Sequence, residues 1–315
     1  MDPASAVRQL PSGAMQQAGG ERASAQRAAL HLVLAIITIA STAVLFRLSE
    51  LPPSATAFYR TILALPILVL WLGLERRRQA RATAGEIFAW RRDGLVLAVG
   101  GLVFAVNIAC YAWAIHFTAI ANASLLSNVS PIFVTLGSYL LFGERVGRRF
   151  LAALGAAIVG AVILTADKLS LAGNHLLGDV LGVLSAAFFA AYLVIVGRLR
   201  QRLSSGVIML WTGVFTALAL GAMSLGAGER LVPATAWGWA VLFALAFVTY
   251  ALGQGLLTSA LAGVSATFSS LALLSLPVNA ALLGWLLLGE PLTLNQVVGG
   301  VIVLASIFMA RQARG

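Results

Sequence analysis

Residues 118–144 read TAIANASLLSNVSPIFVTLGSYLLFGE, and residues 264–290 read VSATFSSLALLSLPVNAALLGWLLLGE. The two stretches lie 146 residues apart, and both have the length and apolar character of a buried helix. Each contains one proline, Pro131 or Pro277, and each ends in Gly-Glu. From residue 114 to residue 144, 9 of 31 positions match their counterparts without a gap. The chain therefore contains an internal duplication.

The composition is that of a polytopic membrane protein. Sixty per cent of the residues are hydrophobic, 10% are charged, and the mean hydropathy is +0.94. Soluble domains carry about 25% charged residues. Apolar runs long enough to cross a bilayer recur along the chain. They predict an all-α protein whose ten spans are roughly 28–47, 55–74, 94–115, 119–142, 150–166, 177–197, 207–226, 235–253, 260–288 and 294–310.

The basic residues predict the orientation of these spans. With both termini in the cytoplasm, 17 arginines fall in the tail, the inner loops or the C-terminus. Only Arg47, Lys168 and Arg230 fall in outer loops. This asymmetry follows the positive-inside rule. Five spans per copy is an odd number, so the copies are predicted to be inverted, as in many transporters.

The duplication predicts three regions. Residues 1–27 are expected to form a disordered cytoplasmic tail, 28–168 the first five-helix repeat, and 177–312 the second. Helix five contains Ala156-x-x-x-Gly160, and helix ten opens with Gly299-Gly300. Small residues at such positions allow close helix contact. The contact could be with a second subunit or within the chain, so a monomer and a homodimer both remain open.

Several function classes are excluded or disfavoured by residue usage. One cysteine, Cys110, rules out an internal disulfide, and three scattered histidines disfavour a metal site. The only lysine, Lys168, follows Asp, so a Walker A loop is impossible and no cofactor is expected. The net charge of +10 fits basic loops on an anionic leaflet better than nucleic acid.

The chain resembles the drug/metabolite transporter superfamily, specifically its EamA-type ten-helix permeases. The residues that carry the resemblance are Pro52-Pro53 with Ala57-Phe58-Tyr59-Arg60, Pro131-Ile132-Phe133-Val134, Leu140 to Arg145, Ser275-Leu276-Pro277, and Leu286 to Thr293 followed by Gly299-Gly300. The resemblance covers about 28–312. It implies a bacterial inner-membrane carrier with a central cavity lined by helices one, three, four, six, eight and nine. Helices five and ten would be peripheral. The Trp-Gly pair of many relatives is replaced by Ser41-Thr42-Ala43.

Helix four carries a polar stripe. Its members are Ser124, Ser127, Asn128, Pro131, Thr135 and Ser138, which are three or four residues apart except for the adjacent Ser127 and Asn128. This spacing places them on one helical face. Because lipid cannot satisfy hydroxyls and amides, the stripe must face protein or water. It lines either a solute cavity or a helix–helix contact.

Other candidate substrate contacts lie in the predicted cavity helices. They are Asn107, Tyr111, Phe188, Tyr192, Tyr250, Gln254 and Ser270. Aromatic rings could stack on a flat solute, and amides in hydrocarbon need partners. Simple packing is the alternative for the rings.

Arg60 is the one clear charge inside a span. It could clamp a carboxylate or phosphate, pair with Glu50 as a structural charge, or extend to the outer headgroups. Pro131 and Pro277 each remove a helix hydrogen bond. We expect the paired kinks to act as gates, with a static bend as the alternative.

The expected function is export of small metabolites. The acidic residues all fall in the tail, in loops or at span ends. Proton-coupled carriers usually hold a titratable group in mid-membrane. We therefore expect alternating access without obligatory ion coupling, and amino acids, aromatic ones included, as substrates. Drug-like compounds and sugar derivatives are the alternative. No convergent catalytic groups are evident, so an enzyme is disfavoured, as is a channel.

Overall fold

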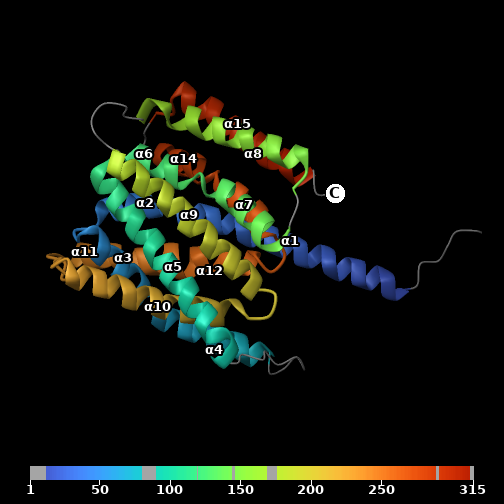
Figure 1. Cartoon of the computed structure of the whole chain (residues 1–315), viewed down its shortest axis with the longest axis horizontal. Coiled ribbons are helices and arrows are strands. Elements are labelled where there is room, and N and C mark those ends of the chain that lie inside the picture. Colours follow the sequence, from blue (N-terminus) through green and yellow to red (C-terminus); the bar gives the residue numbers. More distant parts are fainter. Residues whose placement is uncertain are drawn as a thin grey trace, which may run out of the picture.

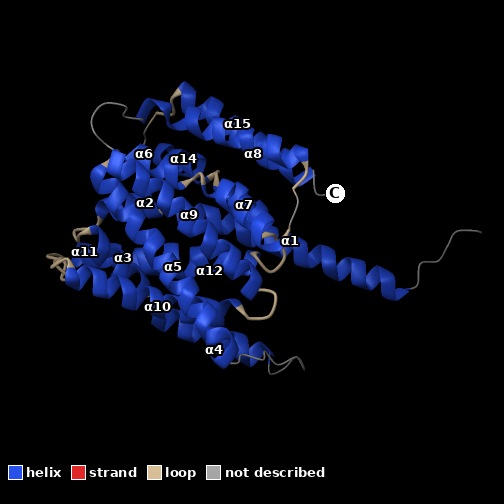
Figure 2. Cartoon of the chain, in the orientation of Figure 1, coloured by secondary structure: helices blue, strands red, loops and turns tan. Residues whose placement is uncertain are grey.

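A computed structural model describes residues 12–79, 90–118, 120–143, 146–168, 176–288 and 291–312. Within these ranges all regular structure is helical (Figure 2), which confirms the predicted fold class. Ten segments there are long and apolar enough to cross a membrane. They are Gln26–Phe46, Pro53–Arg77, Trp90–Phe117, Asn122–Leu141, Arg148–Thr165, Leu176–Leu199, Ser205–Gly226, Ala236–Ala260, Ala266–Leu283 and Leu294–Gln312.

The first half of the chain contains eight α-helices and a short 3₁₀ turn in its described part. They are α1 (Ser12–Ala40), α2 (Thr42–Leu48), α3 (Pro53–Ile62), α4 (Leu65–Gln79), α5 (Trp90–Phe117), α6 (Ile120–Ser127), α7 (Ser130–Phe142), α8 (Arg148–Thr165) and η2 (Ala166–Lys168). The second half contains α9 (Leu176–Leu199), α10 (Ser205–Gly226), α11 (Ala236–Ala244), η3 (Leu245–Gln254), α12 (Gly255–Ala260), α13 (Ala266–Leu273), α14 (Leu276–Leu288) and α15 (Leu294–Gln312).

The duplication is visible in the helix boundaries. Helices α6 and α7 cover 120–127 and 130–142, and α13 and α14 cover 266–273 and 276–288. Every one of these four boundaries recurs at an offset of 146 residues, the offset found in the sequence. Both copies are therefore broken at the same place, between residues 127 and 130 and between 273 and 276.

Each break precedes a proline. Pro131 and Pro277 are the second residues of α7 and α14. A proline has no N–H to donate to the carbonyl four residues earlier, but it is tolerated in the first helical turn. The helix therefore ends and restarts. Span two shows the same pattern before Pro66, with α3 ending at Ile62. The predicted kinks at Pro131 and Pro277 are present, and the break before Pro66 was not predicted.

Span eight contains a π-helical stretch, η3, between α11 and α12. Such wide turns are rare and often occur at functional sites. Helix α12 follows η3 without a break at Gly255 and continues to Ala260. Span eight therefore ends at Ala260, and span nine starts at Ala266. The predicted boundaries, 253 and 260, were wrong because the apolar run after Gly255 belongs to span eight. The Ser265 side chain caps the new helix by accepting a hydrogen bond from the N–H of Phe268.

Helices α8 and α15 lie side by side at the edge of the bundle (Figure 1). An ideal Cβ on Gly299 would lie 2.4 Å from the backbone N of Leu164 and 2.5 Å from the carbonyl O of Gly160. The two glycines therefore let the backbones of α8 and α15 touch within one chain. This accounts for the small residues that sequence alone could not assign to an intrachain or intersubunit contact.

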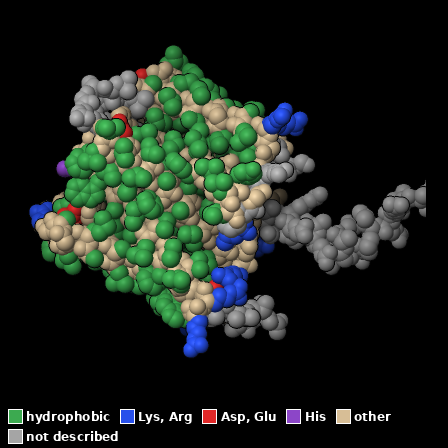
Figure 3. All heavy atoms as spheres, in the orientation of Figure 1, with side chains coloured by type: hydrophobic (Ala, Val, Ile, Leu, Met, Phe, Trp, Pro, Cys, Tyr) green, Lys and Arg blue, Asp and Glu red, His purple; other side chains and the backbone are tan. Residues whose placement is uncertain are grey.

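The surface is that of a membrane protein, with hydrophobic side chains over most of the face in Figure 3 and Lys and Arg mainly at one side. The part of the predicted disordered tail from residue 12 onwards lies in α1 instead, because Ala, Gln, Arg and Glu are favourable helix formers. Residues 1–11 lie outside the described ranges.

Candidate functional site

The centre of the bundle contains a buried arginine. Arg60, in the last turn of α3, is 6% exposed. Its Nε donates a 3.0 Å hydrogen bond to Oγ1 of Thr249, and its Cζ lies 5.5 Å from the ring centroid of Tyr250. Thr249 in turn donates to the carbonyl of Leu245 at 2.8 Å, which leaves its oxygen free to accept from Arg60. Thr249 and Tyr250 both belong to η3.

Aromatic rings enclose this arginine. Tyr192 of α9 and Tyr250 are fully buried. The ring of Tyr192 stacks on Phe104 of α5 with centroids 4.3 Å apart, and Phe104 lies 6.1 Å from the ring of Tyr250. The titratable groups that interact with Arg60 are Tyr250, Tyr192 and Tyr111. We call Arg60, Tyr192, Thr249, Tyr250 and Gln254 the central polar cluster.

Three polar groups of this cluster have no hydrogen-bond partner in the described part of the chain. They are the hydroxyls of Tyr192 and Tyr250 and the Nε2 of Gln254, all with almost no exposed surface. Buried polar atoms are almost always bonded in folded proteins. The Tyr192 hydroxyl faces Gln254, Thr258 and Thr212 without closing a bond to them. Unsatisfied groups of this kind indicate a place where a ligand or water binds.

The polar stripe of helix four faces protein. Ser124 shares a 3.1 Å hydrogen bond with Tyr111 of α5, and Ser127 donates a long 3.5 Å bond to the carbonyl of Gly182 in α9. Asn128 lies in the break between α6 and α7, is half-buried, and makes no side-chain hydrogen bond to described residues. The stripe thus contacts neighbouring helices at Ser124 and Ser127, whereas half-buried Asn128 makes no side-chain hydrogen bond to described residues.

Other predicted site residues lie outside the central polar cluster. Nδ2 of Asn107 donates at 2.9 Å to both the carbonyl and the hydroxyl of Ser185, which joins α5 to α9. Ser270 donates to the carbonyl of Thr267 in its own helix at 2.9 Å. Phe188 is half-buried. Of the predicted residues, the structure brings Tyr192, Tyr250 and Tyr111 near Arg60, with Gln254 beside Tyr192 and Ser124 bonded to Tyr111.

The expected alternatives for Arg60 need correction. Arg60 does not reach the headgroups, because its side chain is buried between α3 and η3. Nor does it pair with Glu50. The Glu50 carboxylate accepts hydrogen bonds from the Thr235 hydroxyl, from the N–H of Ala234 at 2.8 Å and from the N–H of Thr235 at 3.2 Å. It therefore caps α11.

Glu229 makes the reciprocal contact. Its Oε2 accepts from the N–H of Ala55, in the first turn of α3, at 2.7 Å and from the Ser224 hydroxyl at 2.9 Å. The segment before α3 thus caps α11, and the segment before α11 caps α3. These are the helices that carry Arg60 and lead into η3, so the two carboxylates fix the central polar cluster from one end of the bundle.

We expect Glu229→Gln to destabilise the protein by about 1–2 kcal/mol, because a charge-assisted bond to the helix N-terminus is weakened. A thermal melt in detergent measures this, with Arg148→Gln on an exposed helix end as the control. If Glu229→Gln and Arg148→Gln melted at the same temperature, the capping role of Glu229 would be contradicted.

The Thr235 hydroxyl and the two N–H groups hold the pKa of Glu50 below its usual range. Its stabilising contribution is therefore present above the usual carboxyl pKa and is lost as pH falls through the lowered value.

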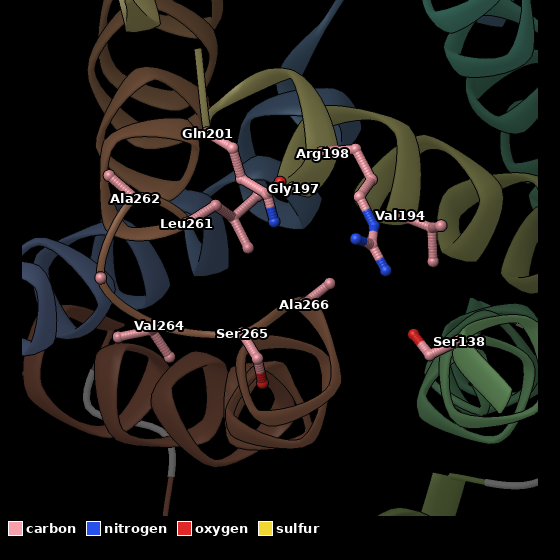
Figure 4. Close-up of a pocket in the computed structure, with 11 residues that line it drawn as sticks. Ser138, Val194, Gly197, Arg198, Gln201, Leu261, Ala262, Val264, Ser265 and Ala266 are labelled. Carbon is pink, nitrogen blue, oxygen red and sulfur yellow. The ribbon is translucent and has the colours of Figure 1, made fainter. Parts of the chain in front are cut away.

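A cavity of about 260 Å³ lies at the arginine-rich end of the bundle (Figure 4). It is formed by α7, the last turns of α9 and the segment that joins α12 to α13, and Arg198 extends into it between Ser138 and Ala266. The lining residues are Ser138, Val194, Gly197, Arg198, Gln201 and Leu261 to Ala266. Arg198 follows Tyr192 by six residues on α9, a rise of about 9 Å. The cavity therefore lies within one or two turns of the central polar cluster.

Three members of the site were missed from the sequence. Thr249, Phe104 and Thr258 carry no signal in a chain where threonine and phenylalanine recur in most spans. The π-helical register that turns Thr249 and Tyr250 toward Arg60 has no sequence signature either. The helix break before Pro66, which places Arg60 at a helix end, could have been found from Pro66 itself.

The comparisons with known proteins agree with this architecture. The model of the EamA-like transporter family matches residues 26–166 and 176–312. The pseudopaline exporter CntI of Pseudomonas aeruginosa is 33% identical over 271 residues, covering 85% of this chain and 89% of that protein. A riboflavin transporter of Vibrio cholerae is 27% identical, covering 83% and 84%. A solved crystal structure has the same fold, with a TM-score of 0.74 at 20% identity over 91% of this chain and 97% of that one.

The chain belongs to the EamA-like transporter family. The resemblance seen in the sequence is confirmed, and so is a multi-pass location in the membrane, the bacterial inner membrane being the one these relatives support.

Proposed function

We propose that this member of the EamA-like transporter family exports small polar metabolites across the inner membrane, amino acids first among them, without catalysing any reaction. The observation that carries the proposal is the central polar cluster, where a buried arginine lies among aromatic rings and unsatisfied hydroxyl and amide groups. Such groups need an occupant that can hydrogen-bond. A relative named as an exporter supports the direction of transport.

Movement of the solute is proposed to follow alternating access. The breaks before Pro131 and Pro277 divide spans four and nine at equivalent positions. In an inverted repeat, equivalent hinges face opposite sides of the membrane. Closing one hinge while the other opens would pass the central polar cluster from one side to the other. The cavity lined by Ser138 and Arg198 is the proposed vestibule on the arginine-rich side.

A second candidate is a permease for larger ring-containing compounds. The stacked rings of Phe104 and Tyr192, with Phe189 6.4 Å beyond, offer a flat aromatic surface beside the site. Two relatives are named riboflavin transporters, and this favours the candidate. The two candidates differ in the size of the solute and share the same site.

The test is efflux from proteoliposomes loaded with a mixed metabolite pool, read by mass spectrometry. We expect release of a small set of solutes by the wild type, none from protein-free liposomes, and slower release by Asn128→Ala. Saturation and counterflow would indicate a carrier. A protonophore should leave release unchanged, because the transport is proposed to need no ion coupling. Uphill accumulation that collapses with the protonophore would refute that part, and no release of any solute would refute export.

A further inference from the structure

The charge of Arg60 has no counter-ion in the described part of the chain. Arg60 makes one hydrogen bond, to Thr249, and the titratable groups near it are tyrosines. A buried charge without a partner is expensive in a membrane. The end of α3 and the ring of Tyr250 offset part of this cost, because helix C-termini and aromatic faces attract cations. Neither of them supplies a negative charge.

The described carboxylates are committed elsewhere. Glu50 and Glu229 cap α11 and α3, and Glu75 accepts from the N–H of Gly206 and from Nε1 of Trp71, both at 2.9 Å. Asp93 pairs with Arg202 at 2.8 Å, Asp179 accepts from Thr118 at 2.9 Å, and Asp167 accepts from the side chains of Thr293 and Asn295. All lie at helix ends. None can turn to neutralise Arg60 without abandoning a bond that holds the fold.

The other unsatisfied groups around Arg60 can all donate. The hydroxyls of Tyr192 and Tyr250 and the Nε2 of Gln254 have hydrogens to donate and make no well-formed hydrogen bond to described residues, although Gln254, Thr258 and Thr212 lie close to the Tyr192 hydroxyl. The guanidinium has five N–H donors, of which Nε uses one. A site with a cation, several donors and no carboxylate is complementary to an anion that has several acceptor oxygens. A guanidinium matches a carboxylate in particular, because it can bind both oxygens.

The vestibule has the same character. Its eleven lining residues include Arg198, Gln201 and two serines, and no acidic residue. Arg198 lies six residues beyond Tyr192 on α9, so the vestibule lies within about two helical turns of the central polar cluster. A cationic side chain in such a cavity raises the local concentration of anions.

We propose that the transported solutes carry a carboxylate and that Arg60 binds it. This inference rests on the proposed function and narrows its substrate class to organic acids and amino acids. The rings of Phe104, Tyr192 and Tyr250 would then contact the rest of the solute. Thr249 positions the guanidinium by accepting from its Nε, so that the terminal nitrogens are directed to the solute.

The test uses a loaded pool of matched pairs. Proteoliposomes are filled with amino acids and their primary amides, and with N-acetyl amino acids such as N-acetyl-phenylalanine and N-acetyl-phenylalaninamide. In each pair that the wild type releases, we expect the acid to leave about 10- to 100-fold faster than the amide, since a charge-assisted contact is lost. Arg60→Gln should abolish this preference, and Arg60→Lys should keep part of it. Arg148→Gln, at an exposed helix end, is the matched control and should behave as the wild type.

The outcomes separate the two proposals. If the wild type releases nothing, export itself is refuted. If it releases acids and amides equally, or if Arg60→Gln keeps the preference, the carboxylate site is refuted while export stands. Thermal melts of the unloaded protein give a second readout. Removing an unpaired buried charge should leave the melting temperature unchanged or raise it. A large fall with an intact acid preference would assign Arg60 a structural role instead.

Discussion

Gly299→Ala should lower the free energy of unfolding by about 3 kcal/mol, at the upper end of the usual cost of overpacking. The added Cβ would lie 2.4 Å from the N of Leu164, 2.5 Å from the O of Gly160 and 2.7 Å from the Cα of Leu164. All three are backbone atoms, so no side-chain rotation can relieve the clash. Helix α15 would have to move away from α8 along much of its length.

The measurement is the melting temperature in detergent, read by fluorescence-detected size exclusion. The matched control is Gly155→Ala on α8, where an added Cβ meets nothing within 4 Å. Alanine replaces the most flexible residue there, so this variant should melt at or slightly above the wild-type temperature. If Gly299→Ala and Gly155→Ala have the same melting temperature, the close contact between α8 and α15 is absent. A change in oligomeric state without a change in melting would place Gly299 in an intersubunit contact.

Most of the fold could be predicted because its sequence signals are long and repeated. Each span is an apolar run of about twenty residues, and the duplication marks equivalent segments without any knowledge of packing. Gly143-Glu144 and Gly289-Glu290 end the two duplicated stretches in the sequence, and α7 and α14 end at Phe142 and Leu288, just before them. The predicted end of span eight at residue 253 was wrong because its helix continues past Gly253 and Gly255 to Ala260.

The site could be predicted only in part. Tyr192, Tyr250 and Gln254 were identifiable as polar or aromatic side chains in hydrocarbon, and they do meet at the centre. Their meeting point, Arg60, could not be placed from the sequence, which left a carboxylate or phosphate clamp, a pair with Glu50 and extension to the outer headgroups open. Depth along a span says nothing about which neighbour a helix faces. That information lies in the close packing at glycines such as Gly101, where a Cβ would lie 2.5 Å from the O of Thr212.

A buried cation and a fully committed set of carboxylates are two parts of one arrangement. Glu50 and Glu229 serve helix ends and Asp93 pairs with the exposed Arg202, so these acidic groups hold the fold at its edges while its centre keeps a positive charge with no described counter-ion. Stability and function are thus assigned to different charges. Variants at the helix ends are expected to change melting, and variants at the centre to change selectivity.

Pro131→Ala should shift the proposed alternating access toward one side. The alanine N–H could donate to the carbonyl of Ser127 and close the break between α6 and α7. A proline inside a helix costs about 3 kcal/mol, so its removal can change the ratio of straight to broken helix by roughly 100-fold. Since a carrier must visit both states, transport should fall by more than about tenfold.

Labelling of single cysteines measures this shift. In a background with Cys110→Ala, Ser124→Cys reports on α6 and Ser138→Cys on the vestibule beyond the break. A membrane-impermeant maleimide is applied to intact cells and to inverted vesicles. Pro131→Ala should raise labelling at one of these positions and lower it at the other, and Pro277→Ala, at the equivalent break, should shift both in the opposite sense. If hinges at equivalent positions of inverted repeats gate opposite faces, replacing either proline must change labelling or transport. Unchanged labelling and transport in both variants would therefore show that the two prolines are static bends.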